Sequence, residues 1–262
     1  MRIKLILTGG GTRGIYQIGA MRALEEIGLM QHVVSISGCS IGAVNAALSL
    51  NYPMEEAKEI WKNFVNNEVF KNIDQYSKSY LMQLCKEYLN PTEGIGINID
   101  PMITYLKYVL DEDKIRASNK ELIISCFNMT SQKLEYRSLD NITEGLLGDY
   151  ILGSARIPFF RPIHIEGSKY VDGGVADNEP RYSILEEKKF DMIITIRIAY
   201  ITRYLLVNRI NNVSSENDIV IKPSSRLGTP INFTKPTFKE KYEMGYNDAI
   251  SYFKTKPHLF QL

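Results

Sequence analysis

The sequence predicts an α/β fold with three layers, in which helices cover both faces of a mainly parallel central sheet. Within the first 50 residues a strand pattern and a helix pattern alternate twice, which favours parallel strands joined by crossover helices. A later apolar run at residues 192–198 is typical of a strand that is buried on both faces of a sheet. A chain of 262 residues can bury a large core without a metal ion or a disulfide bond.

The composition is that of one ordinary globular domain. Hydrophobic residues make up 44% of the chain and charged residues 23%, which excludes the disordered and collagen-like classes of protein. We therefore expect a single domain over residues 1–262, with its informative motifs within residues 1–200. Residues 208–230 are polar and show no clear period, so we expect a mobile surface segment there.

Charge and cysteine content exclude several classes of partner. Lys and Arg number 31 against 30 Asp and Glu, so no net field attracts nucleic acid. The three cysteines, Cys39, Cys85 and Cys126, have the spacing of neither a disulfide framework nor a zinc site. We expect no metal, no cofactor and no nucleic acid partner.

Neither a targeting segment nor a membrane-spanning segment is predicted. The apolar run at the start of the chain stops at Leu7, which is too short for a signal peptide. The uncharged stretch between Glu26 and Glu55 is interrupted by serines, glycines and asparagines, unlike a membrane span. We expect a cytoplasmic protein, with peripheral contact at a membrane as an open alternative.

Glycines mark the ends of elements in the first two strand–helix units. The strand Ile3–Leu7 is short and apolar and runs into three glycines. A helical pattern follows, and Gly28 is placed to end it. Residues 33–36 form the second strand, which leads through Gly38 into a helix of small residues. The helix after Pro53 carries an apolar stripe at helical spacing, formed by Ala57, Ile60, Trp61, Phe64 and Val65.

The rest of the chain continues with helices and hairpins. Asp100 and Pro101 are a typical N-cap and first helical residue. Thr237 and Glu240 have the spacing of a capping box at the start of the last helix. Further strands are predicted at residues 122–127, 133–139, 163–165 and 169–171.

The second glycine motif predicts a nucleophile. It reads Gly38-Cys39-Ser40-Ile41-Gly42, a G-x-S-x-G pattern between an apolar strand and a helix of small residues. In this setting a serine occupies a strained turn that exposes its hydroxyl at the start of the helix. We interpret Ser40 as the nucleophile, and an ordinary turn serine is the alternative.

The first glycine motif is the run Gly9-Gly10-Gly11-Thr12-Arg13-Gly14, which fits the pattern of a dinucleotide-binding loop. That use needs an acidic residue about 20 positions further on, and none occurs between Glu26 and Glu55. A phosphate-binding P-loop is excluded because no Gly-Lys-Ser/Thr closes the run. The remaining use is to present backbone N–H groups to a developing oxyanion.

A nucleophilic serine needs a base. The three histidines have no helpful surroundings in the sequence: His32, His164 and His258. Asp172 is the better candidate, because it ends a strand and is followed by Gly173 and Gly174. An ordinary Asp-Gly-Gly turn is the alternative for this position.

Together these motifs resemble the patatin-like phospholipase family. The matching segments are residues 9–19, 38–47, 154–160, 171–174 and 178–180. Cys39 and Ile41 depart from the family's usual residues, which bears on the fit of the substrate rather than on the chemistry.

The resemblance implies a patatin-like fold and a Ser–Asp dyad that works without histidine. Ser40 would attack a lipid ester carbonyl, and Asp172 would take up the proton and later activate water. Backbone N–H groups of residues 9–14 would hold the oxyanion. The implied activity is that of a phospholipase A or lysophospholipase acting on a lipid ester. The alternatives are an acyltransferase or thioesterase with the same dyad, and a non-catalytic lipid-binding module.

Two basic features have open roles. Arg13 is suited either to steering an anionic head group or to pairing with a buried acid. Residues 192–215 contain no acid and form a basic strip with Arg197, Tyr200, Arg203, Tyr204, Leu205, Leu206 and Arg209. A solvated loop after a buried strand is the simpler interpretation of this strip, and contact with an anionic membrane is the alternative.

Overall fold

The computed structural model describes residues 1–65, 100–156, 160–181, 190–198, 218–228 and 236–256 of the chain. In chain order its helices and strands are β1 (Ile3–Leu7), α1 (Ile15–Glu26), β2 (Val33–Cys39), α2 (Ile41–Asn51), α3 (Met54–Val65), α6 (Asp100–Val109), α7 (Glu112–Ala117), β3 (Glu121–Asn128), β4 (Lys133–Ser138), α8 (Leu147–Ser154), β5 (Ile163–Ile165), β6 (Ser168–Asp172), β7 (Met192–Ile196), β8 (Asp218–Ile221) and α9 (Pro236–Lys254).

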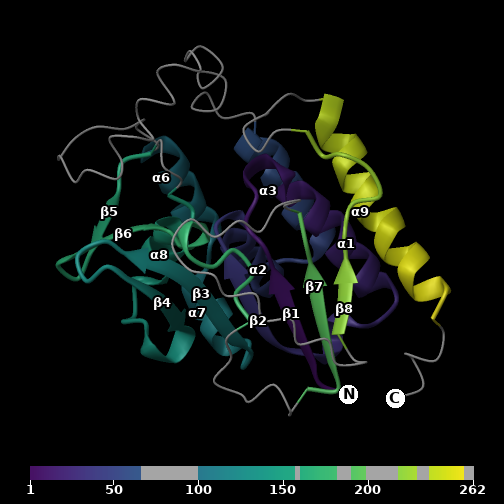
Figure 1. The fold of residues 1–262 in the computed structure, drawn as a ribbon, viewed down its shortest axis with the longest axis horizontal. Helices are drawn as coiled ribbons and strands as arrows, with labels where there is room; N and C mark the ends of the chain where they lie inside the picture. The colour runs from purple at the N-terminus through teal and green to yellow at the C-terminus, as the bar shows by residue number, and fades with distance from the viewer. Residues whose placement is uncertain (66–99, 157–159, 182–189, 199–217, 229–235, 257–262) are drawn as a thin grey trace.

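The strands form one mixed sheet whose central part is parallel (Figure 1). The strand order is β5-β6-β3-β2-β1-β7-β8, and β4 pairs with β3. The run from β3 through β2, β1 and β7 to β8 is parallel, whereas the pairs β3–β4, β3–β6 and β5–β6 are antiparallel. The predicted α/β fold with a mainly parallel sheet is confirmed. Since Leu7 pairs with Gly38, the two glycine motifs follow β1 and β2 at the same edge of the sheet.

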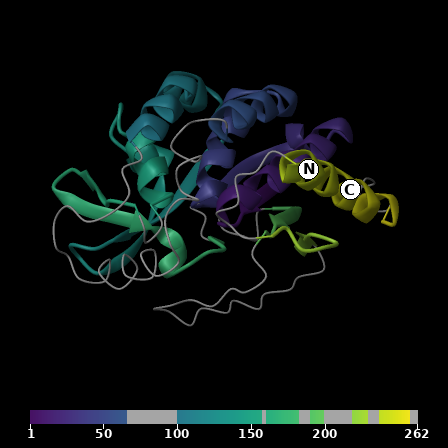
Figure 2. The same ribbon diagram turned by 90° about the horizontal axis from the view of Figure 1, so that it is seen from above.

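The main hydrophobic core lies between the sheet and one layer of helices (Figure 2). Every described α-helix contributes buried side chains to this core. The strands contribute buried residues such as Leu5 of β1 and Ile124 of β3. The opposite face of the sheet carries two small clusters: Ile6, Phe190 and Ile193, and Phe127, Val171 and Ala176. The α-helices of the described ranges thus cover one face, and the predicted second helical layer has no counterpart within them. Residues 182–189 and 199–217 lie outside the described residues.

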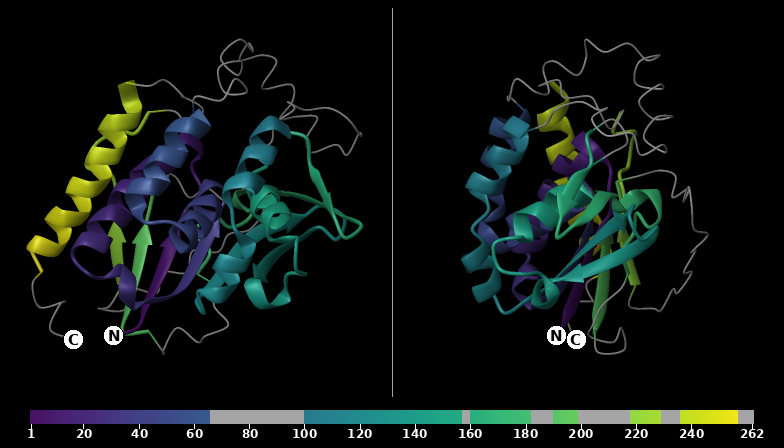
Figure 3. Two further views of the ribbon diagram at one scale, coloured as in Figure 1. Left: turned by 180° about the vertical axis from the view of Figure 1, so that it is seen from behind. Right: turned by 90° about the vertical axis from the view of Figure 1, so that its left-hand side faces the viewer.

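Helix α9 lies along α1, as seen from behind in Figure 3. Two glycines allow the backbones to approach closely. A Cβ on Gly19 of α1 would lie 2.0 Å from the carbonyl oxygen of Tyr242, and one on Gly245 of α9 would lie 2.0 Å from that of Tyr16. The Tyr16 hydroxyl also donates a hydrogen bond to Asp248 at 3.0 Å. The last described helix is therefore tightly joined to the helix that follows the first glycine motif.

Some expectations from the sequence are wrong in detail. The expected mobile segment, residues 208–230, contains strand β8, in which Ile219 and Ile221 are buried against the sheet. The apolar run of β8 is short and has polar neighbours on both sides, so the sequence pattern does not indicate a strand there. Residues 208–217 and 229–230 lie outside the described residues. Helix α9 begins at Pro236, so Thr237 lies in the first turn rather than at the cap. The sequence-based prediction has no counterpart of α7 and α8, because six and eight residues are too few to show a helical period.

Candidate active site

Ser40 lies at the junction between β2 and α2 in a backbone conformation that residues with a side chain rarely adopt. Its φ is 55° and its ψ is −128°, a strain of roughly 1–3 kcal/mol. A Cβ on Gly38 would lie 2.5 Å from the carbonyl oxygen of Gly42, and one on Gly42 would lie 2.2 Å from that of Leu7. Both positions therefore require glycine, and the tight turn places Ser40 at the N-terminus of α2.

Strand β3 brings Asp172 to Ser40. The first part of β3 pairs with β2 and its last three residues pair with β6, whereas β4 pairs along both parts. Because a strand has only two edges, β4 occupies one of them and β2 and β6 share the other. Cys39 at the end of β2 pairs with Ser125, and Asp172 at the end of β6 pairs with the next residue, Cys126. The two strands thus meet end to end, and the serine that follows Cys39 faces the aspartate.

The carboxyl group of Asp172 is buried next to neutral hydrogen-bond donors. The residue is 5% exposed, as is Ser40. Burial raises the pKa of Asp172 to about 6, and the Ser40 hydroxyl, the Gly174 N–H and the Cys39 thiol oppose this rise. The Gly174 N–H donates to Oδ1 at 2.7 Å, and the Cys39 Sγ lies 3.8 Å from the same oxygen. A carboxyl group with this pKa is largely ionised at neutral pH and is a stronger base than an exposed aspartate.

The first glycine motif lies against the nucleophile. A Cβ on Gly9 would lie 2.9 Å from the Cβ of Ser40 and 2.4 Å from the Oδ1 of Asn178. The Gly9 N–H donates to the Asn178 carbonyl at 3.4 Å, and the Asn178 Nδ2 donates back to the Gly9 carbonyl at 3.3 Å. Within the described ranges, the amides of Gly10 and Gly11 find no acceptor. These two N–H groups are therefore free to donate to a ligand beside Ser40.

A buried polar network supports the glycine motif from beneath. The Asn45 Nδ2 donates to the carbonyl of Gly14 at 2.9 Å and to the Oε1 of Gln17 at 2.8 Å. The Trp61 Nε1 donates to the Asn45 Oδ1 at 2.8 Å, and the Gln17 Nε2 donates to the carbonyl of Thr8 at 2.8 Å. All three side chains are buried and hydrogen-bonded to one another, so both ends of the loop are fixed.

Arg13 has a role that neither sequence-based interpretation included. Its guanidinium group donates to the carbonyl oxygen of Gly228 through Nε at 2.9 Å and through Nη2 at 2.7 Å. These bonds join the glycine loop to the segment that follows β8.

The remaining candidates from the sequence lie away from the dyad or outside the described residues. His32 precedes β2, about seven residues or 23 Å of extended chain before Cys39. His164 is an exposed residue of β5. Arg197 of the basic strip donates to both carboxylate oxygens of Glu179, at 2.8 and 3.0 Å. Outside the described residues are His258, Tyr200, Arg203, Tyr204, Leu205, Leu206 and Arg209.

The described residues contain no group of three His, Cys, Asp or Glu side chains that is arranged to hold a metal ion. Within the same ranges, no helix has both the length and the apolar character that a membrane span requires.

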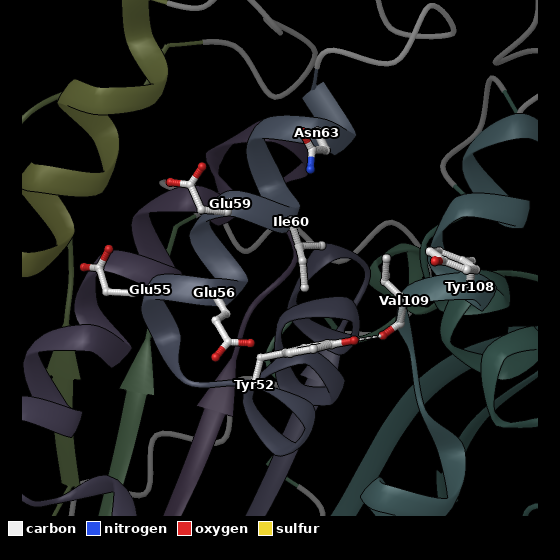
Figure 4. Close-up of a pocket in the computed structure, with 8 residues that line it drawn as sticks. All are labelled: Tyr52, Glu55, Glu56, Glu59, Ile60, Asn63, Tyr108 and Val109. Atoms are coloured by element: carbon white, nitrogen blue, oxygen red, sulfur yellow. Dashed lines mark hydrogen bonds between the residues drawn. The ribbon is translucent and has the colours of Figure 1, made fainter.

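A pocket of about 700 Å³ lies at the other end of α2 (Figure 4). Tyr52, which follows α2, lies on one side of it and donates to the Val109 carbonyl of α6 at 2.5 Å. Helix α3 contributes Glu55, Glu56 and Glu59. The 11 residues of α2 span about 16 Å, so this pocket is separated from Ser40 by the length of that helix.

Two residues that support the dyad, Asn178 and Ser154, lie in segments that carry the family resemblance, but the sequence analysis assigns neither of them a role. Asn178 bridges the two glycine-rich turns, because its side chain lies near both Gly9 and Gly174. Ser154 accepts a hydrogen bond from the Ser40 N–H at 2.8 Å. The family resemblance of residues 154–160 is the signal that could have identified Ser154.

Comparison with known proteins extends these observations. The family model described as patatin-like phospholipase matches residues 5–184. The protein named "Probable lipid hydrolase 463L" of Invertebrate iridescent virus 6 is 24% identical over 243 residues, which cover 85% of this chain and 79% of the viral protein. Triacylglycerol lipase 5 of Saccharomyces cerevisiae is 26% identical over 227 residues, which cover 75% of this chain but only 30% of the yeast protein. The crystal structure of VipD from Legionella pneumophila shares the fold, with a TM-score of 0.57 at 15% identity over 97% of this chain and 67% of that structure. This chain therefore belongs to the patatin-like phospholipase family.

Proposed function

We propose that this protein is a serine lipid acyl hydrolase of the phospholipase A or lysophospholipase type. The observation that carries the proposal is the strained Ser40 at the end of β2, which faces the buried carboxyl group of Asp172 with a pKa of about 6. A serine hydroxyl beside a carboxylate base of this kind is suited to nucleophilic attack on an ester. Family membership and the lipid-directed names of the relatives support a lipid ester as the substrate.

The reaction proceeds in two halves. Asp172 accepts the proton of the Ser40 hydroxyl while Oγ attacks the ester carbonyl, and the tetrahedral intermediate then expels the alcohol with that proton. The product of this half is a fatty acyl ester on Ser40. Asp172 next takes a proton from water, the hydroxide attacks the acyl ester, and the fatty acid leaves while Ser40 regains its proton. The N–H groups of Gly10 and Gly11 hold the negative oxygen in both halves.

A lipid aggregate or membrane surface is the proposed location of the substrate. Long-chain esters are held in such aggregates, so the enzyme has to bind at the interface between lipid and water. The basic strip supplies the cationic and aromatic side chains suited to that contact.

The test is labelling with a fluorophosphonate ester probe, followed by peptide mapping of the modified residue. We expect Ser40 to be labelled in the wild type, no labelling in Ser40→Ala, and fatty acid release from phosphatidylcholine or lysophosphatidylcholine. His32→Gln and His164→Gln are controls that should keep wild-type rates. Labelling at another residue, or a histidine variant as inactive as Ser40→Ala, would contradict the dyad. Transfer of the acyl group to a lysophospholipid instead of water would identify an acyltransferase.

A further inference from the structure

Ser154 is hydrogen-bonded to the backbone of the nucleophile. It is the last residue of α8 and is 0% exposed. Its Oγ accepts the N–H of Ser40 at 2.8 Å and donates to the carbonyl oxygen of Ser125 at 2.7 Å. Because a serine hydroxyl has a single proton, the bond to Ser125 uses that proton and turns a lone pair toward Ser40.

The strained backbone of Ser40 is held on both sides. Its carbonyl oxygen accepts the N–H groups of Ala43 at 2.9 Å and Val44 at 3.4 Å, at the start of α2. Its own N–H follows the last paired residue of β2, and Ser154 is the acceptor for it within the described ranges. Without Ser154 this buried amide would be left unpaired, which is unfavourable, and the turn would be free to relax.

The same segment also holds the base. Two residues after Ser154, the carbonyl oxygen of Arg156 accepts the N–H of Asp172 at 3.0 Å. Ser125, the second partner of Ser154, precedes Cys126, which pairs with Asp172 in the sheet. Residues 154–156 are thus bonded to the ends of β2 and β6 and to the part of β3 where those strands meet.

We propose that residues 154–156 form a positioning clamp for the dyad, in which the Ser154 hydroxyl sets the separation between the Ser40 hydroxyl and the Asp172 carboxylate. The role of the dyad rests on the function proposed above, whereas the clamp rests on the hydrogen bonds of residues 154–156. Ser154 is a positioning residue, because it acts through the backbone of Ser40 and exchanges no proton with the substrate.

The titration of Asp172 reports on this separation. The titratable side chains that face it from the neighbouring strands are the thiols of Cys39 and Cys126, and burial raises the pKa of both, so they stay neutral. The Ser40 hydroxyl lowers the pKa of Asp172. If Ser40 moves away, the carboxyl group therefore titrates at a higher pH.

The experiment compares Ser154→Ala with Ser138→Ala. Ser138 is a matched control because it is 2% exposed and its hydroxyl has no hydrogen-bond partner among the described residues. We expect Ser154→Ala to lower kcat by about 10- to 100-fold with KM changed by less than about twofold, because a small displacement of the nucleophile slows the chemical step. Carboxyl NMR should show Asp172 of Ser154→Ala titrating at a higher pH, with the signal assigned through Asp172→Asn. Ser138→Ala should change neither measurement.

A second variant keeps the test decisive if Ser154→Ala does not fold. Ser154→Cys preserves the shape but donates and accepts weakly, so its kcat should lie between those of wild type and Ser154→Ala. The clamp would be overturned if the Ser154 variants had the same kcat as Ser138→Ala and if their Asp172 titrated at the same pH. If the wild type shows neither hydrolysis nor fluorophosphonate labelling, the proposed function fails, and the NMR titration still decides whether the clamp exists.

Discussion

The Sγ of Cys39 lies 3.8 Å from the Oδ1 of Asp172, although 133 positions separate the two residues in the chain. The thiol is fully buried and its pKa is raised well above the ordinary value, so it contacts the carboxylate as a neutral group. The other donors to Asp172, the Ser40 hydroxyl and the Gly174 N–H, are neutral too. Burial raises the pKa of Asp172, and these neutral donors offset that rise only in part.

The first prediction concerns the pH dependence of activity. Because Asp172 acts in its ionised form and has a pKa of about 6, kcat/KM should fall on the acid side with a midpoint near pH 6. The measurement is fatty acid release from a dispersed short-chain ester between pH 4 and 9. A midpoint close to pH 4, the ordinary value for aspartate, would show that the base is not sheltered in this way.

The second prediction concerns the stability of Asp172→Asn. The folded protein binds the Asp172 proton more tightly than the unfolded chain, so the ionised carboxylate destabilises the fold above pH 6, and this effect disappears below pH 3.8. The Asn variant should lose nearly all activity, and its free energy of unfolding at pH 7 should rise by at most about 3 kcal/mol. Denaturant unfolding of the wild type and the variant at pH 7 and at pH 4 measures this gain in the free energy of unfolding at each pH. A gain of equal size at the two pH values would contradict this origin.

The third prediction separates the strain at Ser40 from its chemistry. Ser40→Ala and Ser40→Gly should both be inactive, but glycine adopts a φ of 55° without the cost that a side chain imposes. We expect Ser40→Gly to be more stable than Ser40→Ala by about 1 kcal/mol, measured by denaturant unfolding. Equal stabilities would mean that the turn is not strained.

The fourth prediction concerns the contact between α1 and α9. In Gly245→Ala the new Cβ would lie 2.0 Å from the carbonyl oxygen of Tyr16, so the helices have to separate. We expect a loss of roughly 1–3 kcal/mol in the free energy of unfolding. Gly148→Ala in α8 is the matched control, because its Cβ would meet only the flexible Lys107 side chain at 3.3 Å. That variant should be unchanged or more stable by up to about 1 kcal/mol.

The fifth prediction tests the basic strip as a membrane contact. The protein should co-sediment with anionic vesicles, less so as salt rises, and the double variant Arg203→Glu, Arg209→Glu should bind more weakly. Arg197→Glu is not a suitable variant, because Arg197 pairs with Glu179. Equal binding of the wild type and the double variant at every salt concentration would remove the strip from the mechanism and leave the dyad assignment intact.

Local features of the site could be predicted from the sequence, whereas long-range ones could not. Gly38 and Gly42 flank Ser40 because a side chain at either position would clash with the backbone of the turn or of the adjacent strand. This requirement is therefore visible in a motif of five residues. The approach of Asp172 depends on β2 and β6 sharing one edge of β3, which no local pattern encodes. Residue type and strand end pointed to Asp172, but the sheltered environment follows only from the folded chain. The same holds for Ser154, whose partners come from two other elements.

Strand β1 and helix α1 flank the glycine loop in the chain, and both pack against segments that come much later in the sequence. β1 pairs with β7 at residues 192–196, and α1 receives α9 at Gly245. While the chain is being synthesised, the first strand and helix therefore emerge from the ribosome long before their partners exist. Contacts between such distant segments form slowly. The glycine loop between β1 and α1 should thus be fully packed only after residues 236–254 have been synthesised.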